Sequence, residues 1–131
     1  MKNTAWLLCV VLALAGLGTA LAQATAQTGK DIPANVIEIF KKNCAGCHTA
    51  QRPSKGLSLI PSRVADVINS PSKEKPSLKL VDTADPEASY LLHKILGASD
   101  ISGSRMPRGK KPLAQADIDA IKAWIVGLNK I

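Results

Sequence analysis

The chain has 131 residues and a formal net charge of +7. This length accommodates one domain and leaves no room for a second. The positive charges are scattered along the chain, which favours acidic protein partners and argues against binding to nucleic acid.

The first 22 residues have the pattern of a bacterial secretory signal peptide. Lys2 gives a positive start, residues 5–22 form an apolar run, and Ala20-Leu21-Ala22 has the small-x-small form that precedes cleavage. We therefore predict export to the periplasm, with cleavage before Gln23 or slightly later. The alternative is a retained membrane anchor, because an apolar run of 18 residues lies at the lower edge for a bilayer span. Membrane association is expected only in that case.

Cleavage would divide the chain into a signal peptide over residues 1–22, a polar flexible lead over residues 23–31 and one domain over residues 32–131. Loss of Lys2 lowers the formal net charge to +6. The sulfur and imidazole side chains that remain are Cys44, Cys47, His48, His93 and Met106.

The first predicted helix covers residues 33–43. Pro33 suits a first helical turn, and Val36 and Phe40 fall on one apolar face. A long irregular stretch rich in proline follows, interrupted by the apolar residues 64–68, which predict a brief helix.

A second helix is predicted to begin at Asp85, as an N-cap residue followed by Pro86, and to end at Gly97. A loop over residues 97–112 precedes the last predicted helix, over residues 114–128. The apolar stripe of that helix consists of Ile118, Ile121, Trp124, Ile125 and Leu128. No useful length of alternating sequence indicates a strand, so the predicted fold class is all-α.

The core of such a domain is thin, because only Phe40, Tyr90 and Trp124 remain as aromatic residues. Short helices joined by long loops bury too little apolar surface to be stable on their own. The architecture therefore predicts a large buried apolar cofactor.

Residues 44–48 read Cys-Ala-Gly-Cys-His, directly after the first predicted helix. Two thiols separated by one helical turn can add across the two vinyl groups of a haem while the following imidazole reaches its iron. We therefore predict that Cys44 and Cys47 hold one covalent haem and that His48 is an axial ligand.

Three other interpretations of the motif are weaker. A redox pair of the thioredoxin type needs a preceding strand, whereas residues 36–43 have the pattern of a helix. A structural zinc site needs four ligands, and His93 is the one further candidate beside the motif. A plain disulfide leaves His48 unexplained.

The second axial position is open to Met106, His93, another group or none. Met106 lies in a loop with Gly103 and Pro107, where its sulfur can reach the other haem face. A loop methionine that only packs on the core is the alternative. His93 is predicted on the side of its helix away from the apolar face, as a solvent-side residue. Met106 is the favoured ligand.

These residues, in this order, resemble class I monohaem c-type cytochromes over nearly the whole mature chain. The stretches Lys55–Leu59, Asp85–Leu92 and Arg105-Met106-Pro107 are also similar to a subgroup first met in planctomycete cytochrome domains. The resemblance implies a cytochrome c-like fold of about three to five short helices around one covalently bound haem c, with long proline-containing loops.

The resemblance further implies that His48 is the proximal and Met106 the distal iron ligand. It implies a contact between Phe40 and Trp124 where the first and last helices cross against the haem edge. Ala114 departs from the family pattern, which usually places a Ser or Thr cap before the last helix.

An iron with both axial positions filled suits electron transfer, so we expect an exported single-electron carrier and not an enzyme. The alternatives are an electron-relay subunit of a larger oxidoreductase, or a haem enzyme or gas sensor with an open iron. Redox donor and acceptor proteins are the expected partners, docking through acidic surfaces. The basic side chains that flank the two ligand segments are Lys41, Lys42, Arg52, Lys55, Arg105, Arg108, Lys110 and Lys111. Ser104 or Arg105 is a candidate contact for the haem propionates.

Overall fold

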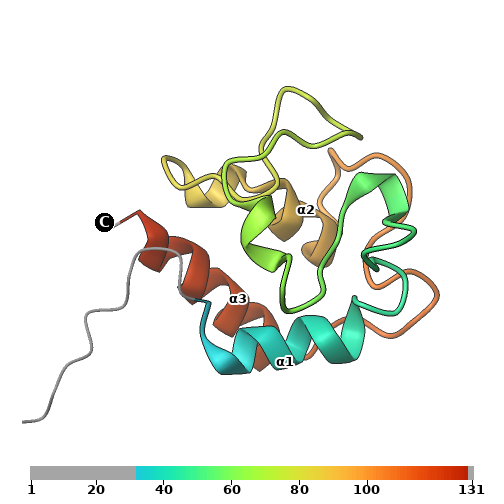
Figure 1. Ribbon diagram of the computed structural model, residues 1–131. Helices are drawn as coiled ribbons and strands as arrows, with labels where there is room; N and C mark the ends of the chain where they lie inside the picture. The colour runs from blue at the N-terminus through green and yellow to red at the C-terminus, as the bar shows by residue number, and fades with distance from the viewer. Residues whose placement is uncertain (1–31, 130–131) are drawn as a thin grey trace, which may run out of the picture.

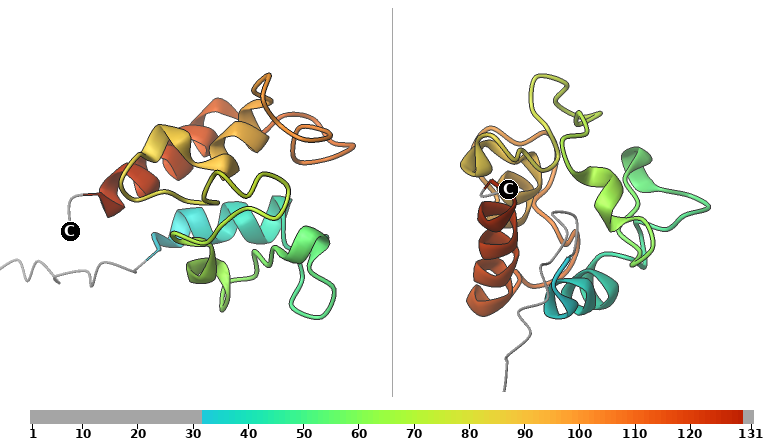
Figure 2. Two further views of the ribbon diagram at one scale, coloured as in Figure 1. Left: turned by 90° about the horizontal axis from the view of Figure 1, so that it is seen from above. Right: turned by 60° about the vertical axis from the view of Figure 1, so that its left-hand side comes forward.

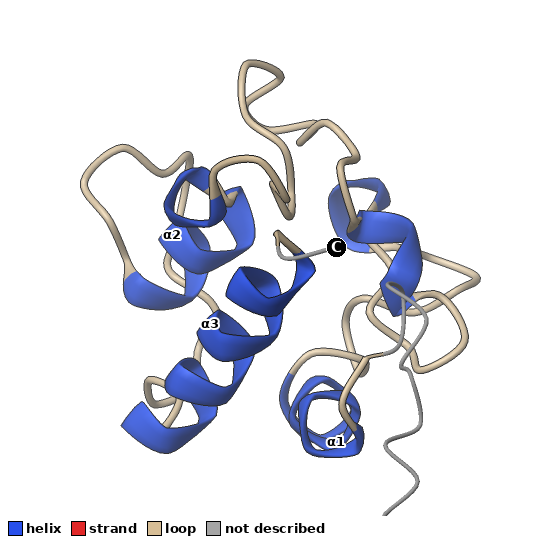
Figure 3. Cartoon of the chain, turned by 90° about the vertical axis from the view of Figure 1, so that its left-hand side faces the viewer, coloured by secondary structure: helices blue, strands red, loops and turns tan. Residues whose placement is uncertain are grey.

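The computed structural model describes residues 32–129. Its helices are α1 (Ala34–Asn43), α2 (Tyr90–Leu96) and α3 (Gln115–Leu128), with three short 3-10 turns, η1 (Ser54–Gly56), η2 (Val64–Val67) and η3 (Pro86–Ala88) (Figure 1). Within these residues the chain forms helices and loops without a strand, which confirms the all-α prediction (Figure 3). The predicted signal peptide, its cleavage site and the lead over residues 23–31 lie outside the described residues. Between residues 32 and 129, no helix is long and apolar enough to cross a membrane.

The first and last helices pack side by side (Figures 1 and 3). The Phe40 and Trp124 rings meet edge to face, with centroids 6.0 Å apart and an interplanar angle of 78°. This geometry is favourable for aromatic pairs and adds to the free energy of burying both rings. The predicted contact between Phe40 and Trp124 is confirmed.

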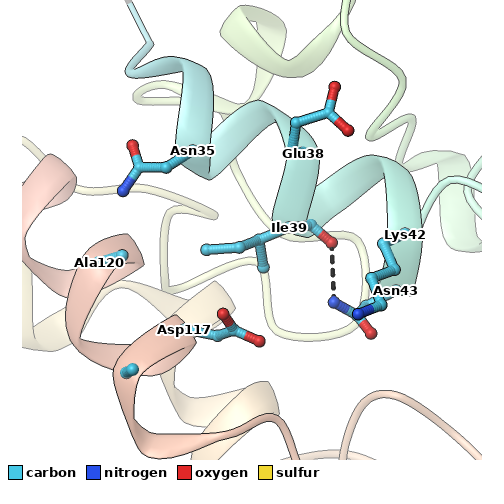
Figure 4. Close-up of a pocket in the computed structure, with 8 residues that line it drawn as sticks. Asn35, Glu38, Ile39, Lys42, Asn43, Asp117 and Ala120 are labelled. Atoms are coloured by element: carbon cyan, nitrogen blue, oxygen red, sulfur yellow. Dashed lines mark hydrogen bonds between the residues drawn. The ribbon is translucent and has the colours of Figure 1, made fainter.

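A groove runs between α1 and α3, where the small residues Ala116 and Ala120 of α3 line it. Ile39 points from α1 toward Ala120, and the polar side chains of Asn35, Glu38 and Asp117 surround the crossing (Figure 4). None of the predicted ligands lines this groove.

The core brings together side chains from all three helices and from η2. Its most completely buried apolar members are Val36, Phe40, Val64, Val81, Leu92, Ile121 and Ile125. The brief helix predicted at residues 64–68 is present as η2, and it contributes Val64 and Val67 to this core.

The prediction of one continuous helix from Asp85 to Gly97 is wrong in its first half. Asp85 precedes only the single turn η3, its side chain makes no capping hydrogen bond, and Ser89 is extended with ψ 115°. The cause is a non-local contact with the segment before it. The amide of Tyr90 donates to the carbonyl of Lys79 at 2.9 Å, so the start of α2 is bound to that segment instead of to η3.

Gly97 ends α2, as predicted, in the left-handed conformation with φ 73°. Its amide donates to the carbonyl of His93 at 2.9 Å. A β-carbon at this position would lie 2.7 Å from Cδ of Arg105, because the following loop crosses here. Glycine is therefore required both for the backbone angle and for the close approach of the loop.

We predict that Ala114→Ser raises the free energy of unfolding by about 1 kcal/mol. Ala114 is the N-cap residue of α3 with extended backbone, and it offers no side-chain acceptor to the amides of the first turn. Urea unfolding measures the change. The same substitution at exposed Ala123, within α3, should lower stability by about 0.5 kcal/mol. Equal effects at the two positions would contradict the capping argument.

We predict that Asp82→Asn reduces the loss of stability in acid. The Asp82 carboxylate accepts hydrogen bonds from Lys79 Nζ at 3.0 Å and from the amide of Ala84 at 2.9 Å. The Lys79 contact, aided by the backbone amides, holds the pKa of Asp82 below its ordinary 3.8. The unfolded chain then binds the proton more readily, so this stabilisation is present above about pH 3.8 and is lost as the pH falls below it.

The free energy of unfolding, measured in urea at about pH 7 and about pH 2.5, gives the test of the Asp82 contribution. The difference between the two pH values should be smaller in Asp82→Asn than in the wild type. Lys79→Met should reduce it as well, since the Lys79 hydrogen bond is the largest cause of the lowered pKa. An unchanged difference in both variants would contradict the prediction.

Candidate functional site

The Cys-x-x-Cys-His motif begins where α1 ends. The amide of Cys44 donates to the carbonyl of Phe40 at 2.8 Å, and the amide of His48 donates to the carbonyl of Cys44 at 3.0 Å. One turn of chain therefore carries both thiols and the imidazole, as the spacing predicted. Cys44 is half-buried, Cys47 is exposed and His48 is buried, with 9% of its surface exposed.

The His48 ring is held in one orientation by the loop that follows it. Its Nδ1 lies 3.1 Å from the carbonyl oxygen of Leu57, and its own carbonyl accepts from the amide of Leu59 at 2.9 Å. A carbonyl oxygen only accepts, so this contact places the ring proton on Nδ1. The lone pair of Nε2 is then available to a metal, and the Leu57 carbonyl acts as the outer hydrogen-bond partner that metal-binding histidines usually have.

The Cys44 thiol does not have the electrostatics of a redox-active cysteine. Burial raises the pKa of Cys44 to about 11, and the attraction of nearby Lys110 only partly opposes it. Redox-active cysteines have a lowered pKa, because the thiolate is the nucleophile. The preceding residues form the helix α1, as predicted, and not the strand of a thioredoxin-like site.

His93 does not join the motif. Its Nδ1 lies 3.0 Å from Oδ1 of Asp100, and its Nε2 lies 2.9 Å from the carbonyl oxygen of Glu87. With 22% of its side chain exposed, His93 is only partly the solvent-side residue that the helix pattern predicted. Across residues 32–129, no three Cys, His, Asp or Glu side chains gather closely enough to hold a metal ion.

Met106 lies in the loop between α2 and α3, half-buried and followed by the buried Pro107. Its amide donates to the carbonyl of Lys94, in the last turn of α2, at 2.8 Å. This loop and the segment after α1 extend to the same side of the molecule (Figures 1 and 2). Lys110, from the loop that carries Met106, also lies close enough to the Cys44 thiol to oppose the rise of its pKa. The sequence prediction that Met106 belongs to a loop near the motif is consistent with this arrangement.

Three buried polar atoms have no hydrogen-bond partner among the described residues: Ser58 Oγ, Arg105 Nη1 and Trp124 Nε1. They come from the loop after the motif, from the residue before Met106 and from α3. A buried donor without an acceptor costs free energy, so such atoms indicate a missing ligand that carries acceptors. Haem has two carboxylate groups as well as a large apolar ring, and the donors therefore fit it.

Of these three residues, only Arg105 was named from the sequence as a candidate donor to the haem propionates. Ser58 and Trp124 were not identified as donors. Ser58 belongs to the stretch on which the family resemblance rests, but nothing in its neighbourhood marks its hydroxyl as buried. Trp124 was predicted as core, and it is 5% exposed, although its indole N–H remains free. Ser104, the other candidate for propionate binding, is exposed.

Comparison with known proteins supports the same cofactor. A family model described as Cytochrome c matches residues 33–129. The corresponding searches gave no match among curated proteins and none among solved structures. Because the family model extends from the start of α1 to the end of α3 and includes the whole motif, the chain belongs to the cytochrome c family, as a class I c-type cytochrome with covalently bound haem c that transfers electrons.

Proposed function

We propose that this protein is an exported carrier of single electrons, in which His48 and Met106 are the two axial ligands of the haem iron. Cys44 and Cys47 provide the two thioether bonds to the haem. The observation that carries the proposal is the contact of His48 Nδ1 with the Leu57 carbonyl, at 3.1 Å, because it leaves Nε2 as the ligand atom. The loop that carries Met106 extends to the same side of the molecule as the motif, which supports Met106 as the second ligand.

Bound haem c would supply one-electron redox chemistry, and His48 and Met106 would together leave no open position on the iron for a substrate. A methionine ligand raises the reduction potential relative to a second histidine. The residues of this chain have three tasks in such a carrier. They fix the imidazole, hold the methionine loop in place and keep water away from the iron.

Two further kinds of buried group would surround the haem. Val36, Phe40 and Leu59 supply the apolar wall, since each is at most 2% exposed. Ser58, Arg105 and Trp124 offer buried donors to the haem carboxylates. Arg105 is half-buried, whereas the other basic residues near the ligand segments are exposed. We therefore propose that Arg105 binds the haem and is not part of the docking surface.

Those other basic residues are exposed and form the proposed docking surface. They are Lys41, Lys42, Arg52, Lys55, Arg108, Lys110 and Lys111. Complementary charge mainly speeds association and orients the partner, which suits a carrier that must bind and leave quickly. We therefore propose acidic docking surfaces on both the electron donor and the electron acceptor.

We predict that Met106→Ala abolishes the near-infrared charge-transfer band between methionine sulfur and ferric iron. The reduction potential should decrease, by less than the range of about 0.8 V over which axial ligands set it. Carbon monoxide should bind the reduced variant readily and the reduced wild type poorly. Leu113→Ala is the matched control, because Leu113 is a buried residue of the same loop that cannot bind iron.

The band should remain in Leu113→Ala. A wild type that lacks the band, or that binds carbon monoxide readily, would favour a haem enzyme or gas sensor with an open iron. Co-purification of the native protein with a larger oxidoreductase would favour the relay subunit.

We predict that Cys44→Ser and Cys47→Ser each keep the haem attached through one thioether, and that the double variant loses it. Haem staining after denaturing electrophoresis measures the attachment. Cys9→Ser is the control, since that thiol belongs to the predicted signal peptide and should not affect staining. The intact mass of the exported protein shows at the same time whether cleavage occurs before Gln23. Covalent haem in the double variant would contradict the assignment.

A further inference from the structure

Lys94 is a buried charge in the last turn of α2, with 7% of its surface exposed. Its Nζ lies 3.0 Å from Oε2 of Glu74 and donates to the carbonyl of Ser102 at 2.7 Å. A buried ammonium group is tolerated only when partners replace its hydration. These partners come from the segment before α2 and from the loop after it, so Lys94 connects three parts of the chain.

Tyr90, one turn earlier on α2, binds the same two partners. Its hydroxyl accepts from the amide of Ser102 at 2.9 Å and lies 3.5 Å from Oε2 of Glu74. Both polar groups of the Ser102 backbone are therefore taken by side chains of α2. The Lys94 ammonium also lies 5.9 Å from the centre of the Tyr90 ring, within reach of a cation–π contact.

A second set of contacts fixes the same loop nearer the surface. Lys75 Nζ lies 2.7 Å from Oδ2 of Asp100, and His93 Nδ1 lies 3.0 Å from its Oδ1. Glu74 and Lys75 are neighbours in sequence, as are His93 and Lys94. Lys75 and His93 thus hold Asp100, whereas Lys94, which is paired with Glu74, holds Ser102.

The loop over residues 98–106 has little internal support. Ile101 donates to the carbonyl of Ala98 at a long 3.4 Å. The firm hydrogen bonds of this segment run to α2 and to Lys75, and the last of them joins the Met106 amide to the Lys94 carbonyl at 2.8 Å. The position of Met106 therefore depends on contacts that Lys94 makes with both its side chain and its backbone.

We propose that Lys94, paired with Glu74, is the positioning residue that holds the 98–106 loop against α2 and so keeps the Met106 sulfur at the haem iron. This inference rests on the proposed ligation by Met106. Lysine suits the role because one ammonium group can donate to the Glu74 carboxylate and the Ser102 carbonyl together. An apolar side chain of similar length would fill the space but leave the Ser102 carbonyl without a donor. The Glu74 carboxylate would then keep only the long 3.5 Å contact with the Tyr90 hydroxyl.

The test uses the full haem-loaded protein and the variants Lys94→Met, Glu74→Gln and Tyr90→Phe. In Lys94→Met the near-infrared methionine band should fall at least about twofold and the reduction potential should decrease, because the loop opens locally. Amide exchange of Met106 in the reduced state, followed by NMR, should accelerate about tenfold. Lys94→Arg retains the charge and should restore part of the band.

Lys122→Met is the matched control. It removes a Lys–Glu pair of similar length, 2.8 Å to Glu87, which joins α3 to η3 and does not touch the loop. This variant should keep the wild-type band, potential and exchange rate. If Lys94→Met assembles poorly, Tyr90→Phe gives the test of the loop contacts. This variant keeps the ring and removes only the hydroxyl oxygen that accepts from the Ser102 amide.

A full band with wild-type potential and wild-type Met106 exchange in Lys94→Met and Tyr90→Phe would overturn the inference while leaving the proposed function intact. A band absent from the wild type itself would overturn the proposed ligation and this inference together.

Discussion

The edge-to-face contact between Phe40 and Trp124 is the interaction on which the rest of the structure depends. It joins α1 to α3, and the Phe40 carbonyl also accepts the amide of Cys44, so the motif begins at the crossing itself. The direction in which the thiols and His48 leave α1 is thus set by the packing of the two helices. The remaining loops are arranged around a motif whose starting point is already fixed.

The features that are local in sequence were predictable. The helical periodicity of residues 33–43 and 114–128, the Gly97 stop and the Cys-x-x-Cys-His spacing each depend on neighbouring residues, and the structure has all of them. The break at Ser89 was not predictable in this way. It depends on the Lys79 carbonyl, ten residues earlier in a loop without periodicity, which takes the amide that a longer helix would have used.

Around the candidate site, too, the contacts between residues distant in sequence could not be predicted. A lysine at position 94 has the pattern of a solvated helical residue, and its burial follows only from the approach of Glu74 and Ser102. Trp124 was correctly placed in the core, whereas the free indole N–H is visible only in the folded arrangement. Sequence patterns therefore identify the groups that bind a cofactor more readily than those that hold its ligands in place.

The attachment of the start of α2 to a distant segment has a consequence for folding. α2 has seven residues, too few for an isolated helix to be stable in water. Its first amides depend on residues 79–80 and its last turn depends on the loop that carries Met106. These three segments should therefore form and open as one cooperative unit. With the proposed ligation, a partly unfolded molecule would keep the haem bound on the His48 side while the Met106 side was exposed to solvent.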